Sequence, residues 1–199
     1  MNCFAIRMPK HTTAARTMAD IKISFLLVFF ATLFSFGQPQ FTTYQQICQK
    51  TTDRNTCIQI IDASTSAKLK ANANGWLQIL SDQAKTIATL TVTKNGDALK
   101  NPPSRPVAKG LLDCQFIYNF TIIPDIENIE WANLNRSNYP DYNRALSLTE
   151  LGVNNCEDEF IDLPTPSPID VFNQNVKHIV DITLEVLNLN QCNKISACT

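Results

Sequence analysis

The sequence predicts an all-α protein, an up-down-up-down four-helix bundle preceded by a short helical pair. Over several long stretches after residue 37, apolar residues recur at three- and four-residue steps, which is the period of an α-helix. The connections between these stretches are short, so neighbouring helices are expected to pack antiparallel. With only five glycines in 199 residues, few positions interrupt the helical pattern.

The first 37 residues are expected to form a secretory signal peptide. Residues 23–36 read ISFLLVFFATLFSF, an uncharged apolar run that follows basic residues, and Ser35 and Gly37 supply the small residues of a cleavage site. Cleavage is therefore expected after Gly37. The run is shorter than the roughly 20 residues of a membrane-spanning helix, so an uncleaved anchor is the less favoured alternative. Met18 is an alternative start, since the stretch from Met18 to the same site is a complete signal peptide.

Removal of this segment would leave residues 38–199 as one domain with an acidic balance. It takes away four of the 17 Lys and Arg residues and one of the 18 Asp and Glu residues, so the remaining net charge is about −4. Neutralisation of phosphates drives affinity for nucleic acid, so an acidic chain without a basic run is a poor nucleic-acid ligand. No membrane association is expected once the leader is removed.

Two short helices are expected at the start of this domain, over residues 42–50 and 56–67, with a polar turn between them. Cys48 and Cys57 would lie about 13.5 Å apart in one straight helix, whereas a disulfide needs Cα atoms within roughly 7 Å. If these two cysteines are joined, the chain must double back between them.

Two longer helices are expected next, over residues 74–93 and 107–133. The first is expected to be ended by Asn95-Gly96 and the Asn101-Pro102-Pro103-Ser104 segment, because these residue types weaken or stop helices. The second contains Pro124, which removes a backbone hydrogen bond and is expected to kink or break the helix.

The last two helices are expected over residues 141–148 and 169–189. Gly152 is expected to weaken the first of these helices before Cys156. Three prolines in residues 163–168 predict an extended connection to the second.

Cysteine usage supports export. Cys3 lies in the leader, and six cysteines remain, an even number that favours a disulfide framework with 15 formal connectivities. A zinc site is the alternative, but its close C-x-x-C pairs are missing. The six are Cys48, Cys57, Cys114, Cys156, Cys192 and Cys198.

No catalytic, cofactor-binding or metal-binding site is predicted. The sequence contains no nucleophile elbow, zinc-protease motif, P-loop or dinucleotide fingerprint. His178 has no partner motif and is interpreted as a surface residue rather than a base. The acidic run Glu157-Asp158-Glu159, with Asp162, is interpreted as a solvated helix face rather than a cation site.

Three cysteine-containing segments follow one another along residues 38–199: Cys48-x8-Cys57 with Thr51 between, Leu111-x-Asp113-Cys114-x3-Tyr118, and Cys156-x-Asp158-x-Phe160. In this order they resemble the first cysteine pair, the L-x-D-C-x-x-x-Y segment and the C-x-D-x-F segment of the plant invertase and pectin methylesterase inhibitor family. The resemblance implies a disulfide-stapled helical hairpin, Cys48–Cys57, and a bundle stapled by Cys114–Cys156. With those four paired, Cys192 and Cys198 would remain to pair.

The resemblance also implies a function. It predicts a secreted, non-catalytic inhibitor that blocks the active-site cleft of a pectin methylesterase in a one-to-one complex, in the apoplast or cell wall. An acid invertase of the cell wall or vacuole is the alternative target, and a non-inhibitory helical binding protein is the second alternative. Residues 105–107 read Arg-Pro-Val where invertase inhibitors of this family often carry Pro-Lys-Phe, which favours pectin methylesterase.

Some positions depart from the family pattern. Pro124 interrupts a helix that is usually continuous, and Asp181-Ile182 replaces the usual small-residue and Asn pair. Thr149 lies about two residues further from the fourth cysteine than is usual. Because the matched motifs belong mainly to the scaffold, no partner-binding residue is predicted.

Two glycosylation sequons are present, at Asn119-Phe120-Thr121 and Asn135-Arg136-Ser137. Asn135 lies near a predicted helix end and is expected to be the better acceptor. Asn119 lies inside a predicted helix and is expected to be used only if it faces outward.

Overall fold

The computed structural model describes residues 43–195 of the chain, and their side chains as far as residue 191. The expected signal peptide, Cys198 and the side chain of Cys192 lie outside this description. Residues 43–195 form helices and connecting loops, without a strand. The predicted all-α class is therefore confirmed.

The described chain begins with a helical hairpin. Helix α2 (Tyr44–Cys48) and helix α3 (Arg54–Ala63) are joined by a turn, and a single helical turn, α4 (Ala67–Lys70), follows. A disulfide joins Cys48 to Cys57 with their Cα atoms 5.6 Å apart, so the chain does double back between them. This is the hairpin that the sequence predicted.

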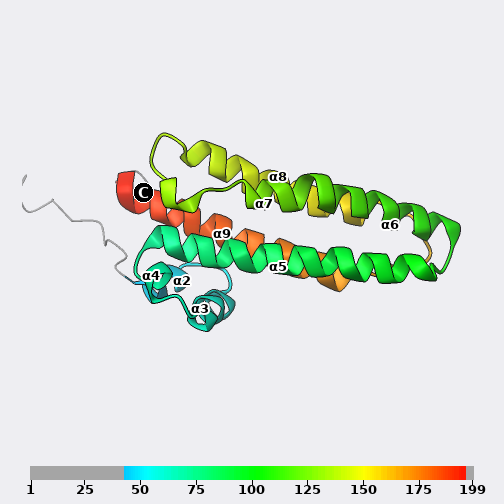
Figure 1. Cartoon of the computed structure of the whole chain (residues 1–199), viewed down its shortest axis with the longest axis horizontal. Helices are drawn as coiled ribbons and strands as arrows, with labels where there is room; N and C mark the ends of the chain where they lie inside the picture. The colour runs from blue at the N-terminus through cyan, green and yellow to red at the C-terminus, as the bar shows by residue number, and fades with distance from the viewer. Residues whose placement is uncertain (1–42, 196–199) are drawn as a thin grey trace, which may run out of the picture. The chain divides into compact units, whose positions relative to one another are not determined.

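Four long helical segments form the bundle, and they run alternately in opposite directions (Figure 1). Helix α5 packs along α9, and α8 packs against both α9 and α6, so the apolar side chains of all four segments meet in one core. The hairpin lies beside the first half of α5. The segments are α5 (Ala73–Lys100), α6 (Arg105–Ile117) continuing through η1 (Tyr118–Ile122) and α7 (Ile123–Glu127), α8 (Tyr139–Asp158), and α9 (Asp170–Ile195); the single turn η2 (Trp131–Asn133) precedes α8.

Helix α5 runs past the Asn95-Gly96 pair, so the prediction was wrong there, and the helix ends at Lys100, directly before the Asn101-Pro102-Pro103-Ser104 segment. Asn95 is fully buried, and its side-chain amide donates a hydrogen bond to the Leu111 carbonyl oxygen of α6 at 2.8 Å. Gly96 faces open space. The hydrogen bond from Asn95 to α6 therefore outweighs the weak helix propensity of the Asn95-Gly96 pair, and Gly96 lies where no neighbour disturbs the helix.

Pro124 distorts its helix without ending it. The turn before it, η1, is a π-helix, in which the Ile123 amide donates to the Tyr118 carbonyl five residues earlier. A proline in an α-helix lacks the N–H donor and clashes with the carbonyl four residues before it. The wider π turn relieves this conflict, and α7 continues from it.

Helix α8 is much longer than predicted and includes Gly152. This residue is buried against η1, where an added Cβ would lie 3.0 Å from Ile122 Cγ1. The glycine therefore brings α8 close to the π turn instead of weakening the helix.

Among the glycines that the structure describes, Gly75, in the first turn of α5, has the least room for a side chain. An added Cβ would lie 2.1 Å from the Leu69 carbonyl oxygen, which belongs to the backbone of α4. We expect Gly75→Ala to destabilise the protein by roughly 1–3 kcal/mol, because the backbones must separate. Chemical denaturation followed by circular dichroism measures this loss.

The matched control lies in the same helix. Gly96→Ala adds its Cβ to open space, and it should stabilise the protein by roughly 0.5–1 kcal/mol, as expected for alanine in a helix interior. Equal unfolding free energies for the two variants would contradict the close approach of α4 and α5.

Candidate protein-binding surface

An apolar stripe lies on the solvent side of α6 and η1. Leu112, Phe116 and Phe120 are 58%, 62% and 69% exposed, and we call them the apolar face. Steps of four residues place helical side chains next to one another, and the rings of Phe116 and Phe120 lie 4.7 Å apart between centroids. Clustered large apolar side chains in contact with water are typical of interaction sites.

The opposite side of the same helix is firmly held in the core. Leu111, Cys114 and Tyr118 are fully buried there. A disulfide joins Cys114 to Cys156 of α8, with Cα atoms 4.8 Å apart. One turn before Cys114, Gly110 allows the Phe160 ring to pack closely, since a Cβ added at Gly110 would lie 3.1 Å from that ring. The helix that carries the apolar face is therefore held in place by a disulfide and by close packing.

A buried polar network completes this support. The Tyr118 hydroxyl donates to Asn173 Oδ1 at 2.7 Å, and the Asn173 amide donates to the Glu157 carboxylate and to Cys156 Sγ. Burial raises the pKa of the Tyr118 phenol and also that of the Glu157 carboxyl. Tyr118 consequently remains a neutral donor, and the network ties η1 to both α8 and α9.

The acidic run does not converge on one point. Glu157 bonds to Asn173 inside the protein, whereas Glu159 forms an ion pair with Lys109 of α6 at 3.3 Å. Among the described residues, no three His, Cys, Asp or Glu side chains are grouped so that they could hold a metal ion. No helix within residues 43–195 is both long enough and apolar enough to cross a membrane.

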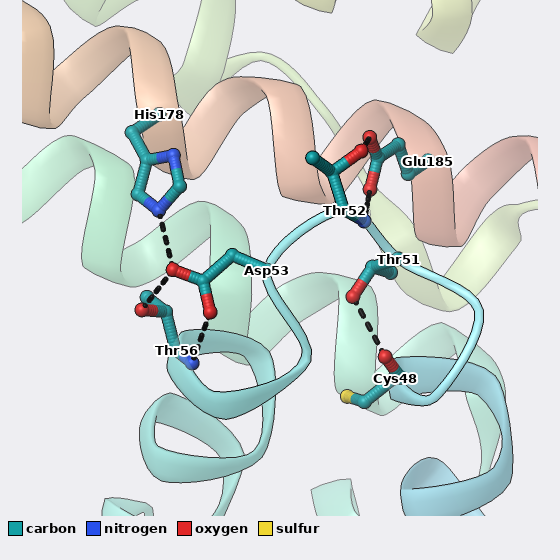
Figure 2. Close-up of polar contacts among 7 residues, drawn as sticks. All are labelled: Cys48, Thr51, Thr52, Asp53, Thr56, His178 and Glu185. Carbon is teal, nitrogen blue, oxygen red and sulfur yellow. Dashed lines mark hydrogen bonds and ion pairs between the residues drawn. The ribbon is translucent and has the colours of Figure 1, made fainter.

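The hairpin is attached to α9 by polar contacts, which Figure 2 shows. The Thr52 amide donates to the Glu185 carboxylate at 2.7 Å, and the Thr52 hydroxyl bonds to the same group. His178 Nε2 lies 3.1 Å from Asp53 Oδ2. Within the hairpin, the Thr51 hydroxyl donates to the Cys48 carbonyl at 2.8 Å. A shallow pocket at this junction is lined by Thr52, Asp53, His178, Asp181, Ile182, Leu184, Glu185 and Asn188.

His178 has a structural partner that the sequence did not reveal. Its ring is 44% exposed, as expected for a surface residue, but it pairs with a carboxylate 125 residues away. The contact joins the start of α3 to α9, which gives His178 a part in attaching the hairpin.

Asp53 makes the start of α3, and with it the contact to His178, sensitive to acid. The backbone amide and hydroxyl of Thr56, followed by His178, lower the pKa of the Asp53 carboxyl to about 2. A lowered pKa means that the ionised form favours the folded state, so this stability is present above pH 4 and is lost as the pH falls toward 2. We expect thermal unfolding between pH 5 and 2 to depend less on pH in Asp53→Asn.

The asparagine side chain can still accept the Thr56 amide hydrogen bond as a helix cap, so this variant removes the titration and keeps the cap. Asp82→Asn, at an exposed position of α5, is a control that should follow the parent protein. Identical pH profiles for Asp53→Asn and the parent would contradict the assigned role.

Both sequon asparagines lie on the surface. Asn119 is part of η1, between Phe116 and Phe120 in the chain. Asn135 lies in the loop before α8, where its Nδ2 donates to the Asn133 carbonyl at 2.9 Å and its Oδ1 accepts from the Ser137 amide at 2.9 Å.

Comparisons with known proteins agree with this architecture. The model of the plant invertase/pectin methylesterase inhibitor family matches residues 42–186. The fold is similar to two crystal structures of Arabidopsis pectin methylesterase inhibitors. One, a mutant form, has a TM-score of 0.60, 18% identity, and coverage of 74% of this chain and 97% of its own. The other has a TM-score of 0.50, 20% identity, and coverage of 73% and 94%.

At these identities the structural similarity establishes the fold alone, and a search of curated protein sequences gave no match. The family match is the stronger finding, because it spans most of the chain and both described disulfides. The chain belongs to the plant invertase/pectin methylesterase inhibitor family.

Proposed function

We propose that this protein is a secreted inhibitor of a pectin methylesterase, and that it docks the apolar face against the entrance of the active-site cleft in a one-to-one complex. The observation that carries the proposal is the exposed pair of adjacent rings, Phe116 and Phe120, on a helix that a disulfide joins to α8. Aromatic side chains at the centre of an interface commonly contribute most of its binding energy.

The scaffold suits a blocking role that needs no chemistry. The disulfide and the Tyr118 network hold the surface before binding, so little side-chain and backbone freedom is lost in the complex. An interface of about 800 Å² per partner is within reach of two or three helix faces. The two exposed leucines of the neighbouring helix α8, Leu148 and Leu151, could extend the contact.

An acid invertase is the second candidate target, because the family includes inhibitors of both enzymes. Residues 105–107 form the first turn of α6, where Arg105 and Pro106 are exposed and Val107 is fully buried. What favours a methylesterase target is that this exposed turn reads Arg-Pro-Val where invertase inhibitors of the family often carry Pro-Lys-Phe.

Export is part of the proposal. A leader that ends at Gly37 would bring the chain to an oxidising compartment, where disulfides such as Cys48–Cys57 and Cys114–Cys156 persist. N-terminal sequencing of secreted protein should begin near Gln38, and retention of residues 23–36 would contradict cleavage. We place the mature protein in the apoplast or cell wall, with the vacuole as the alternative.

An inhibition assay tests the function. Purified residues 38–199, with disulfides intact, should reversibly inhibit a pectin methylesterase at mildly acidic pH, with a calorimetric stoichiometry of one. Its acidic charge should accelerate docking on a basic enzyme, so affinity should weaken with salt. Inhibition of an acid invertase alone would shift the target, and inactivity against a panel of both enzymes would support a non-inhibitory binding protein.

A further inference from the structure

The sequon at Asn119 lies within the apolar face. Asn119 is exposed on the π turn, adjacent in sequence to Phe120 and three residues after Phe116. Its side chain makes no hydrogen bond to another described residue, whereas both ends of the Asn135 carboxamide are engaged in a local turn. The folded protein can therefore hold an oligosaccharide on Asn119 without losing a side-chain hydrogen bond, whereas one on Asn135 would disturb the local turn.

We propose that Asn119 carries an N-linked oligosaccharide, and that its first sugars cover the rings of Phe116 and Phe120. The bond that forms joins Asn119 Nδ2 to the anomeric carbon of the oligosaccharide. The bond that breaks joins this carbon to a lipid-linked pyrophosphate, which leaves with its electron pair as the amide loses a proton. Transfer precedes folding, because residues 119–121 must reach the transferase before they become helical.

The two rings provide a platform for such a sugar. One face of a pyranose ring presents C–H groups, which pack against the face of an aromatic ring. Phe116 and Phe120 lie 4.7 Å apart with 35° between their planes, and each is more than half exposed. Covering them removes apolar surface from water, which is favourable in proportion to the area buried.

The glycan would also regulate the surface, a consequence that rests on the proposed function. An oligosaccharide on Asn119 and a bound enzyme would need the same space above Phe116 and Phe120. Glycosylated molecules should then inhibit weakly, and molecules that escape modification should inhibit fully. The fraction of Asn119 that is modified would set the inhibitory capacity of the secreted protein.

The first experiment needs no enzyme. The full chain is expressed in a secreting plant host, beside Asn119→Gln and the matched control Asn135→Gln. We expect mass spectrometry after enzymatic deglycosylation to show Asn119 converted to Asp. Hydroxyl-radical labelling of Phe116 and Phe120 should be several-fold slower in the glycosylated protein than in Asn119→Gln. The half-buried ring of Phe172 on α9 should be labelled equally in both. An unmodified Asn119, or equal labelling of the two face rings, would overturn the proposal.

The second experiment measures inhibition of a pectin methylesterase. Asn119→Gln should inhibit at least tenfold more strongly than the glycosylated protein, equivalent to about 1.4 kcal/mol, and Asn135→Gln should match the parent. Slow labelling of the rings with no inhibition by any form would refute the proposed function and leave the glycan placement intact. Equal inhibition by both glycoforms would refute the regulatory role.

Discussion

Replacement of both Phe116 and Phe120 by aspartate is expected to weaken inhibition by at least roughly 100-fold. Truncating one central aromatic side chain commonly costs about 2 kcal/mol of binding free energy, roughly 30-fold in affinity. The two rings are in contact, so their effects should not simply add. The negative charges would in addition be desolvated in the complex. Inhibition constants of protein made without glycosylation measure the effect.

The design separates binding from folding. Both rings are more than half exposed, and exposed substitutions usually change stability by no more than about 0.5 kcal/mol. Val171→Asp is the matched control, since Val171 is 68% exposed but lies on α9, outside the apolar face. A loss of inhibition in Val171→Asp with normal inhibition by the Phe116→Asp, Phe120→Asp variant would assign the interface elsewhere.

Removal of the Cys114–Cys156 disulfide is expected to cause the largest loss of stability. The two cysteines are 42 residues apart, and the chain-entropy model assigns about 4 kcal/mol to a loop of this size. The Cys114→Ala, Cys156→Ala variant should therefore unfold at a much lower denaturant concentration than the parent. It should also inhibit less well, because the support beneath the apolar face is loosened.

The hairpin disulfide provides the comparison. Cys48 and Cys57 are nine residues apart in the sequence, for which the same model gives about 2.6 kcal/mol. The Cys48→Ala, Cys57→Ala variant should lose less stability than the bundle variant when both are measured under non-reducing conditions. The reverse order would mean that the bundle disulfide contributes little beyond the packing of α6 against α8.

The sequence predicted the fold because two of its signals do not depend on long-range contacts. Apolar periodicity indicates helices in any globular context, and the position of the polar turn between Cys48 and Cys57 is a local property. The ends of α5 and α8 were predicted wrongly because Asn95 and Gly152 act through neighbouring helices. Local propensity does not contain this information.

The candidate surface was missed for a different reason. The predictions for this helix concern Leu111, Cys114 and Tyr118, which match a family segment, and none concerns its other side. Yet Leu112, Phe116 and Phe120 are themselves spaced by four residues, so a second apolar stripe was available in the sequence. The contact between Asp53 and His178 had no comparable signal, because 125 residues separate them.

The π turn at η1 explains how one helix can carry two apolar stripes in alignment. In a regular α-helix, each step of four residues overshoots a full turn by about 40°. The buried residues Cys114, Tyr118, Ile122 and Ile126 take three such steps in succession, so a regular helix would rotate the last one away from the core. The π turn contains more residues per turn than an α-helix, so it reduces this rotation. The same effect keeps Phe120 aligned with Phe116. The π turn that accompanies Pro124 therefore keeps the buried residues on the inner side of the helix and the exposed aromatic residues on its outer side.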